Sequence, residues 1–303
     1  MTNNVYHIPV LFSESIDAMK IDEGQLFVDV TYGGGGHSTE ILKRMSKDSI
    51  LMAFDQDDDA LNNIVDDERL IFVNANFRFL KNFLKYYQLN GVDAILADLG
   101  VSSHQFDEVD RGFSIRSNAR LDMRMNQNAD LDAFKVVNKY SDKELYRVFN
   151  SYADLKNVGR VVPTIIKARK VKPIETTFDL VELLKDLVKG KKQNQFLAQI
   201  FQAIRIEVND EMGALQDMLE QAADVLKPGG RLVVIAYHSI EDRLVKNFIK
   251  TGTFDGKVES DIYGNINAPL KAITRKPIVP NNDENIKNSR ARSAKMRIAI
   301  KND

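Results

Sequence analysis

A run of four glycines, residues 33–36, places the strongest constraint on the fold of this chain. It follows a short apolar segment, Leu26–Val30, and precedes a segment with helical spacing, Thr39–Met45. Consecutive glycines between a strand and a helix predict a tight turn whose backbone approaches a ligand closely. A second apolar segment ends at Asp55, where a carboxylate can accept both hydroxyls of a ribose. The pattern therefore predicts a cofactor that contains a nucleoside.

The alternation of strand and helix continues to residue 99 and resumes after residue 205, which predicts an α/β fold with a doubly wound parallel sheet. The early predicted strands are Leu26–Val30, Ile50–Phe54, Leu70–Val73 and Asp93–Leu99, and the helices are Thr39–Met45, Asp59–Val65 and Phe77–Tyr87. The later elements are a helix Val208–Leu226, a stop at Lys227–Gly230, a strand Arg231–Tyr237 and a helix from Ser239. Two antiparallel strands, separated by a polar loop at Asn281–Asn288, are expected to close the sheet edge.

The segment between residues 106 and 205 contains no strand pattern. Helical spacing recurs there in Leu131–Tyr140, Lys143–Phe149, Leu155–Lys170, Phe178–Val188 and Phe196–Ile204. Ser141, followed three residues later by Glu144, predicts a capping box. We therefore expect one α/β domain, residues 1–105 and 206–303, interrupted by an all-helical domain, residues 106–205.

Composition excludes several classes of protein. The chain has no cysteine, so disulfides, cysteine-ligated zinc and a thiolate nucleophile are absent, and we expect no metal site. A formal charge of -1 excludes a uniformly basic nucleic-acid binder, so any such binding must be local. The apolar segments are too short to cross a bilayer and the first residues do not resemble a signal peptide. We expect a cytoplasmic protein without a membrane partner.

The glycine run fits the dinucleotide pattern G-x-G-x-x-G poorly. Counted from Gly34, the third glycine is replaced by Thr39, and counted from Gly33 it is replaced by Ser38. Asp29 stands where dinucleotide-binding strands are usually apolar, and an acid there suits the ammonium group of S-adenosylmethionine better than a pyrophosphate. S-Adenosylmethionine is therefore the favoured cofactor, and a nucleotide-dependent oxidoreductase is the alternative enzyme.

Asp98 ends the fourth predicted strand and should face the same crevice as the glycine turn. Many methyltransferases that act on exocyclic amines carry an acidic or amide residue there, followed by two prolines and an aromatic residue. This chain has Leu99 and Gly100 instead. The alternative role for Asp98 is to cap the following turn through backbone hydrogen bonds.

Blocks along the chain resemble, in order, the bacterial 16S ribosomal RNA cytosine-N4 methyltransferase family of the MraW or RsmH type. They include HIPVL, DVTYGGGGHS, DLGVSSHQ, LDMRM, YHSIEDRLVK and NSRARSAKMRIA, and they run from residue 7 to residue 299. Arg120 and His104 stand where the family often has proline. The resemblance implies a class I S-adenosylmethionine-dependent fold with a helical insertion. It also implies methylation of one cytidine in the decoding region, in the assembled small subunit.

The resemblance further implies a set of cofactor contacts, namely Gly35, Gly36, His37, Asp55, Phe77, Asp98 and Gln105. A core position is the alternative for Phe77, and a surface position is the alternative for Gln105. The lack of cysteine disfavours methylation at cytosine C5, which proceeds through a cysteine adduct, whereas amine methylation needs alignment and charge stabilisation. We predict that Asp98 is catalytic and accepts the amine proton, with His238 or a backbone carbonyl as alternatives.

Two basic stretches without acidic residues are candidates for RNA binding. The first contains Lys156, Arg160, Lys167, Arg169, Lys170 and Lys172, and the second contains Lys287, Arg290, Arg292, Lys295, Arg297 and Lys301. The segment from Asp55 to Glu68 is acidic and should repel phosphate. A solvated face is the alternative for either stretch. A non-catalytic RNA-binding factor of ribosome assembly is the alternative function.

Overall fold

The computed structural model describes residues 9–155, 158–258 and 268–302, which form two compact units. The sheet unit comprises Met1–Gly100 and Gly213–Asp303, and the helical unit comprises Val101–Met212. The helical unit contains the whole of the predicted insertion, residues 106–205, and also Gln105.

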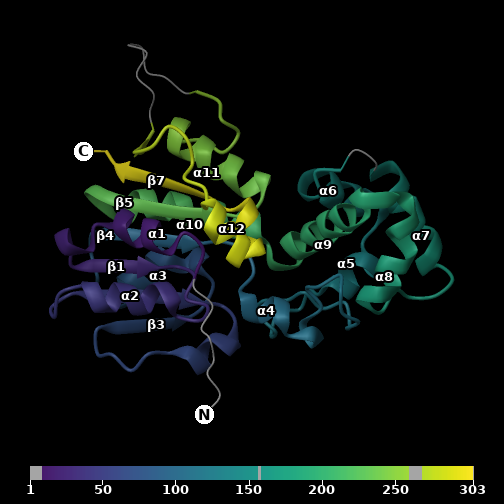
Figure 1. The fold of residues 1–303 in the computed structure, drawn as a ribbon, viewed down its shortest axis with the longest axis horizontal. Coiled ribbons are helices and arrows are strands. Elements are labelled where there is room, and N and C mark those ends of the chain that lie inside the picture. The colour runs from purple at the N-terminus through teal and green to yellow at the C-terminus, as the bar shows by residue number, and fades with distance from the viewer. Residues whose placement is uncertain (1–8, 156–157, 259–267, 303) are drawn as a thin grey trace. The chain divides into compact units, whose positions relative to one another are not determined.

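The sheet unit is built on a seven-stranded sheet with the order β3-β2-β1-β4-β5-β7-β6 (Figure 1). The strands are β1 Leu26–Asp29, β2 Ile50–Asp55, β3 Leu70–Asn74, β4 Val92–Asp98, β5 Leu226–Ala236, β6 Leu270–Ala272 and β7 Lys295–Lys301. Strands β1 to β5 are parallel, and β7 runs antiparallel to both of its neighbours. The predicted α/β sheet and its antiparallel edge are confirmed. Strand order reverses between β1 and β4, where open α/β sheets bind their ligands at the carboxyl ends.

Helices cover this sheet and bury both of its faces. They are α1 Phe12–Met19, α2 Gly36–Arg44, α3 Leu80–Tyr86, α10 Glu211–Val225, α11 Ser239–Thr251 and α12 Asn282–Lys287, with the first two residues of α10 in the helical unit. One core joins α1 and α2 to the central strands through Ile16, Ile41, Phe27 and Leu96. Burial on both faces explains why the central strands read as continuous apolar runs.

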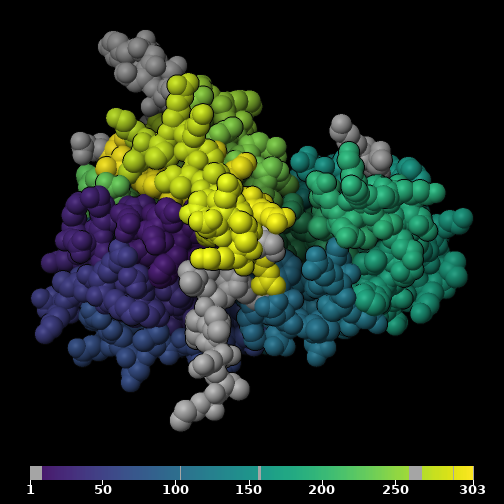
Figure 2. Space-filling model, in the orientation of Figure 1, coloured from purple at the N-terminus to yellow at the C-terminus, as the bar shows by residue number. Residues whose placement is uncertain are grey.

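The helical unit has a hydrophobic core of its own, which includes Phe149, Val161, Leu180 and Ile200. Its helices are α4 Ser103–Asp107, α5 Ala133–Lys139, α6 Asp142–Tyr152, α7 Val158–Arg169, α8 Thr177–Leu184 and α9 Gln193–Asn209. Figure 2 shows α6 to α9 as a closely packed teal and green surface. The predicted capping box of Ser141 and Glu144 is confirmed at the start of α6.

The described residues also include short 3₁₀ turns. They are η1 Ile21–Glu23, η2 Asp58–Asn63, η3 Phe77–Phe79, η4 Val109–Arg111, η5 Lys185–Leu187, η6 Gly190–Lys192 and η7 Ser289–Ser293. The predicted helix Asp59–Val65 is wrong, because η2 replaces it and leaves Leu61 47% exposed. Without an apolar face to bury, an α-helix has little to stabilise it here.

Three further predictions need correction. The long helix Val208–Leu226 is divided at Asp210, whose φ of 46° ends α9 before α10 begins. The stop at Lys227–Gly230 lies inside β5, where the register against β4 shifts between Val92 and Ala94. The polar loop Asn281–Asn288 contains α12, whose first turn is capped because the side chain of Asn281 accepts from the Glu284 amide at 2.8 Å.

None of the helices in residues 9–155, 158–258 and 268–302 has the length and apolar character needed to cross a membrane.

The central strand β4 provides a test of the core. Leu96→Ala removes a side chain that is 0% exposed, so we expect it to lower the free energy of unfolding by about 2–5 kcal/mol in urea denaturation. Leu61→Ala, at an exposed position of η2, is the matched control and should cost less than about 1 kcal/mol. Equal losses in the two variants would contradict this description of the core.

Candidate functional site

The carboxyl group of Asp29 connects three segments at the carboxyl edge of the sheet. Its side chain is fully buried, and its Oδ2 accepts a hydrogen bond from Ser38 Oγ of α2 at 2.7 Å. Its Oδ1 accepts from the Thr31 amide at 3.0 Å and from the Thr31 hydroxyl at 3.3 Å. The Thr31 oxygen in turn accepts from the Asp98 amide at 2.7 Å. Asp29 therefore ties together the carboxyl ends of β1 and β4 and the start of α2.

This arrangement contradicts the expectation that Asp29 meets the ammonium group of the cofactor. Burial raises the pKa of Asp29, and its hydrogen bonds to Ser38 and Thr31 act in the opposite direction. With no exposed surface, the carboxyl group of Asp29 supports Thr31 and Ser38 and is not open to a ligand.

The glycine turn between β1 and α2 is shaped by the protein's own packing. Gly35 has a φ of +75°, and a Cβ there would lie 2.8 Å from the hydroxyl oxygen of Tyr32. A Cβ on Gly36 would lie 2.7 Å from Cγ of Pro9. Both positions therefore exclude a side chain before any ligand is considered. The turn presents backbone, as predicted, but Tyr32 and Pro9 are what impose glycine at Gly35 and Gly36.

Asp55 ends β2 beside this turn. Its Oδ2 accepts from the Gly33 amide at 2.7 Å, and its Oδ1 accepts from the Asp57 amide at 2.9 Å. Burial raises the pKa of Asp55 to about 6, although these two hydrogen bonds lower it. Asp55 therefore lies next to the glycine turn, as the sequence pattern predicts. Each of its carboxylate oxygens retains a lone pair that can accept from a hydroxyl group.

Phe77 begins η3, three residues after β3 ends. The side chain is half-buried, so it is not one of the buried core residues that the alternative reading expected. Asn76, just before it, donates through Nδ2 to Gln56 Oε1 at 2.9 Å, which joins the segments that follow β2 and β3. Phe77 therefore lies at the same sheet edge as Asp55, and its contact with an adenine stays a prediction.

Asp98 ends β4 and faces two polar side chains. Its Oδ1 accepts from the hydroxyl of Tyr237 at 2.8 Å, and its Oδ2 lies 3.9 Å from Nδ1 of His37. Burial raises the pKa of Asp98 to about 7, the bond from Tyr237 lowers it, and the charges of Asp29 and Glu241 raise it further. A carboxyl group with this pKa can take up a proton near neutral pH.

His37 lies in the first turn of α2 and is buried against the ring of Phe12, with ring centroids 5.7 Å apart. Burial lowers the pKa of His37 to about 4, so its imidazole is neutral at physiological pH. Its Nε2 has no hydrogen-bond partner among the described residues. Such a buried nitrogen commonly marks the position of a ligand or an ordered water.

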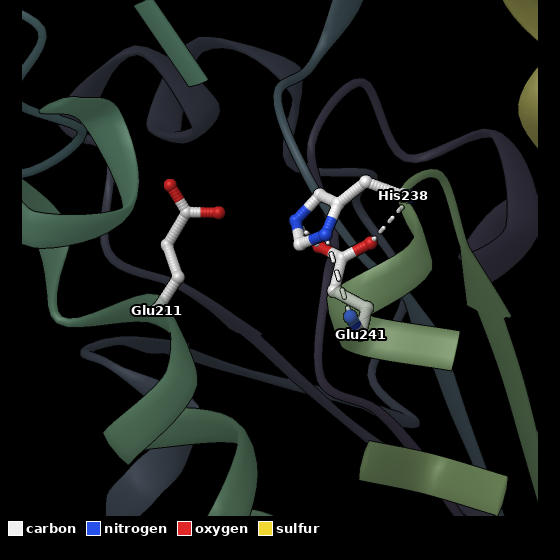
Figure 3. Close-up of side chains that lie close together, drawn as sticks. All are labelled: Glu211, His238 and Glu241. Carbon is white, nitrogen blue, oxygen red and sulfur yellow. Dashed lines mark hydrogen bonds and ion pairs between the residues drawn. The ribbon is translucent and has the colours of Figure 1, made fainter. Parts of the chain in front are cut away.

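His238 and Glu241 form the first turn of α11, as Figure 3 shows. The Nδ1 of His238 accepts from the Glu241 amide at 3.3 Å, and its Nε2 lies 3.1 Å from Oε1 of Glu241. The backbone amides of Tyr237 and His238 both donate to Oε2 of Glu241. His238 therefore caps a helix, a role that its sequence context did not predict. Glu211, drawn in the same figure, forms a two-point ion pair with Arg205 in the helical unit.

Gln105 belongs to α4 of the helical unit. It forms a capping box with Ser102, because its Oε1 accepts from the Ser102 amide at 3.0 Å and its own amide donates to Ser102 Oγ at 3.2 Å. The residue is 5% exposed, so the alternative of a surface side chain is wrong. Its contact with the cofactor stays a prediction.

The two basic stretches divide into exposed and structural residues. In the first, Arg160, Lys167, Lys170 and Lys172 are exposed, and Lys156 lies outside the described residues. Arg169 instead donates to the carbonyls of Val137 and Tyr140 at 2.7 and 2.5 Å, which satisfies the carboxyl end of α5. In the second stretch, Lys295 and Arg297 pair with Asp242, whereas Lys287, Arg290 and Arg292 are exposed.

Comparison with known proteins gives matches along nearly the whole chain. A model of the MraW methylase family matches residues 4–302. The chain is 54% identical over 297 residues to a protein of Phocaeicola vulgatus, covering 98% of each chain. It is also 54% identical over 300 residues to a protein of Flavobacterium johnsoniae, covering 99% of each. Both relatives bear the name Ribosomal RNA small subunit methyltransferase H.

Neighbouring basic residues of the helical unit are expected to respond differently to substitution. Arg169→Ala leaves the carbonyls of Val137 and Tyr140 without their donor, so the free energy of unfolding should fall by about 1–3 kcal/mol. Lys170→Ala, at the adjacent exposed position, is the control and should change it by less than about 0.5 kcal/mol. Urea denaturation measures both, and a Lys170 variant as unstable as the Arg169 variant would refute the distinction.

Proposed function

Because the chain belongs to the MraW methylase family of S-adenosylmethionine-dependent ribosomal RNA methyltransferases, we propose that it methylates the exocyclic N4 amine of a specific cytidine in the decoding region of 16S ribosomal RNA. The observation that carries the proposal is the pair of carboxylates, Asp55 and Asp98, beside the glycine turn where strand order reverses. Asp55 suits the hydroxyls of a ribose, and Asp98 suits the amine that receives the methyl group. The proposed substrate is the assembled small subunit, modified in the cytoplasm.

The residues of the crevice suit S-adenosylmethionine. Asp55 would accept the ribose hydroxyls, Phe77 would lie against the adenine, and the turn at Gly35 and Gly36 would line the cofactor. The Nε2 of buried His37, which has no hydrogen-bond partner among the described residues, supports a polar ligand here. Asp98 completes the proposed contacts of the sheet unit, and the contact predicted for Gln105 rests on the family resemblance alone. When bound, S-adenosylmethionine supplies a methyl group already activated by its sulfonium charge.

The proposed role of Asp98 is to accept a proton from the cytosine amine. The N4 nitrogen forms a bond to the methyl carbon, the carbon–sulfur bond breaks with its electron pair left on sulfur, and one N4 proton passes to Asp98. The Oδ2 atom suits this role because Oδ1 already accepts from Tyr237. His238 is less well suited, because its Nδ1 is engaged in the helix cap. The chain has no cysteine, in keeping with a reaction that needs no covalent adduct.

The helical unit is the proposed RNA-recognition domain. Four exposed cations, Arg160, Lys167, Lys170 and Lys172, lie on α7 or within three residues of its end, and cations of this kind bind phosphate. The exposed Lys287, Arg290 and Arg292 of the sheet unit offer a second set. The acidic residues of η2 disfavour phosphate on that part of the sheet unit.

Transfer of labelled methyl from S-adenosylmethionine to small subunits, followed by nucleoside analysis, tests the proposal. We expect N4-methylcytidine in the decoding region and less product with free 16S RNA. Label at cytosine C5 or on a ribose hydroxyl would refute the proposed chemistry. An unmodified cytidine with retained RNA binding would favour a non-catalytic assembly factor. Calorimetric binding of NADH but not of S-adenosylhomocysteine would favour an oxidoreductase.

Cofactor binding should depend on the ionisation of Asp55. The pKa of Asp55 is raised to about 6, so lowering the pH through 6 protonates the group that accepts the ribose hydroxyls. Affinity for S-adenosylhomocysteine should be steady above pH 7 and should weaken about tenfold per pH unit below pH 6, because only the ionised form accepts both hydroxyls.

Isothermal titration calorimetry between pH 5 and 8 measures this dependence. Asp55→Asn is the comparison variant and should bind at least about tenfold more weakly at pH 8, with the step near pH 6 removed. If the step persists in the asparagine variant, another group is responsible for it.

A further inference from the structure

Tyr237, the residue directly after β5, places its phenol beside the carboxylate of Asp98 at the end of the neighbouring strand β4. Asp98 pairs in register with Ile235 of β5, and Tyr237 lies two residues beyond Ile235. Tyr237 directly follows Ala236, the last residue of β5, and packs against the same core cluster as Ile235, and its hydroxyl lies 2.8 Å from Oδ1 of Asp98. An aromatic residue thus reaches this carboxylate although Leu99 and Gly100 follow it in sequence.

Tyr237 is fixed at both its backbone and its ring. Its amide donates to Oε2 of Glu241 at 2.8 Å, and the Glu241 side chain is only 2% exposed. Gly100, with a φ of +94°, lies against the ring, since a Cβ there would be 3.6 Å from Cδ2 of Tyr237. The phenol is therefore held in one place relative to β4, as a group that orients another must be.

We propose that Tyr237 is a positioning residue for methyl transfer, which holds Oδ1 of Asp98 so that Oδ2 is directed to the amine proton. This inference rests on the proposed role of Asp98 as proton acceptor. Tyr237 itself neither gains nor loses a proton in the reaction. The donor at Oδ1 also stabilises the ionised carboxylate, the form that accepts a proton.

The ionisation of both groups agrees with this role. Burial, together with the adjacent charge of Asp98, raises the pKa of Tyr237 well above its ordinary value of 10, so the phenol remains a donor throughout the range of an assay. The bond from Tyr237 lowers the pKa of Asp98 against the larger effect of burial. Removing the hydroxyl should therefore raise the pKa of Asp98 further.

Tyr237→Phe tests the proposal, because it removes the hydroxyl and keeps the ring. Single-turnover methyl transfer to small subunits, measured from pH 5.5 to 9.5, should show the acidic limb displaced upward by about one pH unit. Because Oδ2 is no longer directed at the amine, the rate at pH 9.5 should fall several-fold, and the rate below the limb should fall about tenfold further. The dissociation constant of S-adenosylhomocysteine should change by less than about threefold.

Two further variants make the outcome decisive. Tyr140→Phe is the matched control, since Tyr140 is a half-buried tyrosine of the helical unit whose hydroxyl donates to Glu207, and it should leave the profile unchanged. Asp98→Asn should abolish transfer at every pH. If Asp98→Asn is inactive, two results for Tyr237→Phe would overturn the positioning role and leave the proton acceptor standing. One is a pH profile that matches wild type, and the other is an equal loss of rate at all pH values with no displacement of the acidic limb. An active Asp98→Asn enzyme would overturn both this inference and the proposed proton acceptor.

Discussion

The geometry of the candidate site in the sheet unit depends on the hydrogen bonds of one buried carboxyl group, Asp29. Asp29 fixes Thr31 and Ser38, and Thr31 fixes the backbone of Asp98, so a single side chain connects the ends of β1 and β4 to the start of α2. An unpaired carboxylate in this position would be strongly destabilising, and the hydrogen bonds around Asp29 offset its desolvation.

Much of the sheet could be predicted from sequence because its strands are buried on both faces and their apolar runs are unambiguous. The positions of Asp55 and Asp98 followed from the same pattern, since the carboxyl ends of parallel strands share one edge. The role of Asp29 is not evident from sequence, because a strand-end acid that supports its neighbours has the same sequence pattern as one that meets a ligand. Tyr237 was missed as a partner of Asp98 because the contact depends on the register between β4 and β5, which strand propensities do not contain.

The basic stretches illustrate the same limit. Arg169 and Lys170 are adjacent and carry the same charge, yet one is bonded to two backbone carbonyls and the other is exposed. The difference arises from where α7 ends relative to the open carbonyls of α5. The sequence pattern likewise predicts a loop where α12 forms. Glu284 of α12 accepts a hydrogen bond from the amide of Leu11, the N-cap residue of α1, which has no side-chain cap of its own. Figure 2 shows the yellow surface of α12 beside the purple surface that includes α1.

Strand order also constrains how the chain can fold while it is being synthesised. β7, residues Lys295–Lys301, lies between β5 and β6, so the edge of β5 remains unpaired until β7 has been synthesised. The hydrogen bond of the Leu11 amide likewise cannot form until Glu284, 273 positions later, has been synthesised. An open apolar edge strand is a site of intermolecular pairing. The nascent protein therefore carries a risk of aggregation at the β5 edge until β7 pairs with it.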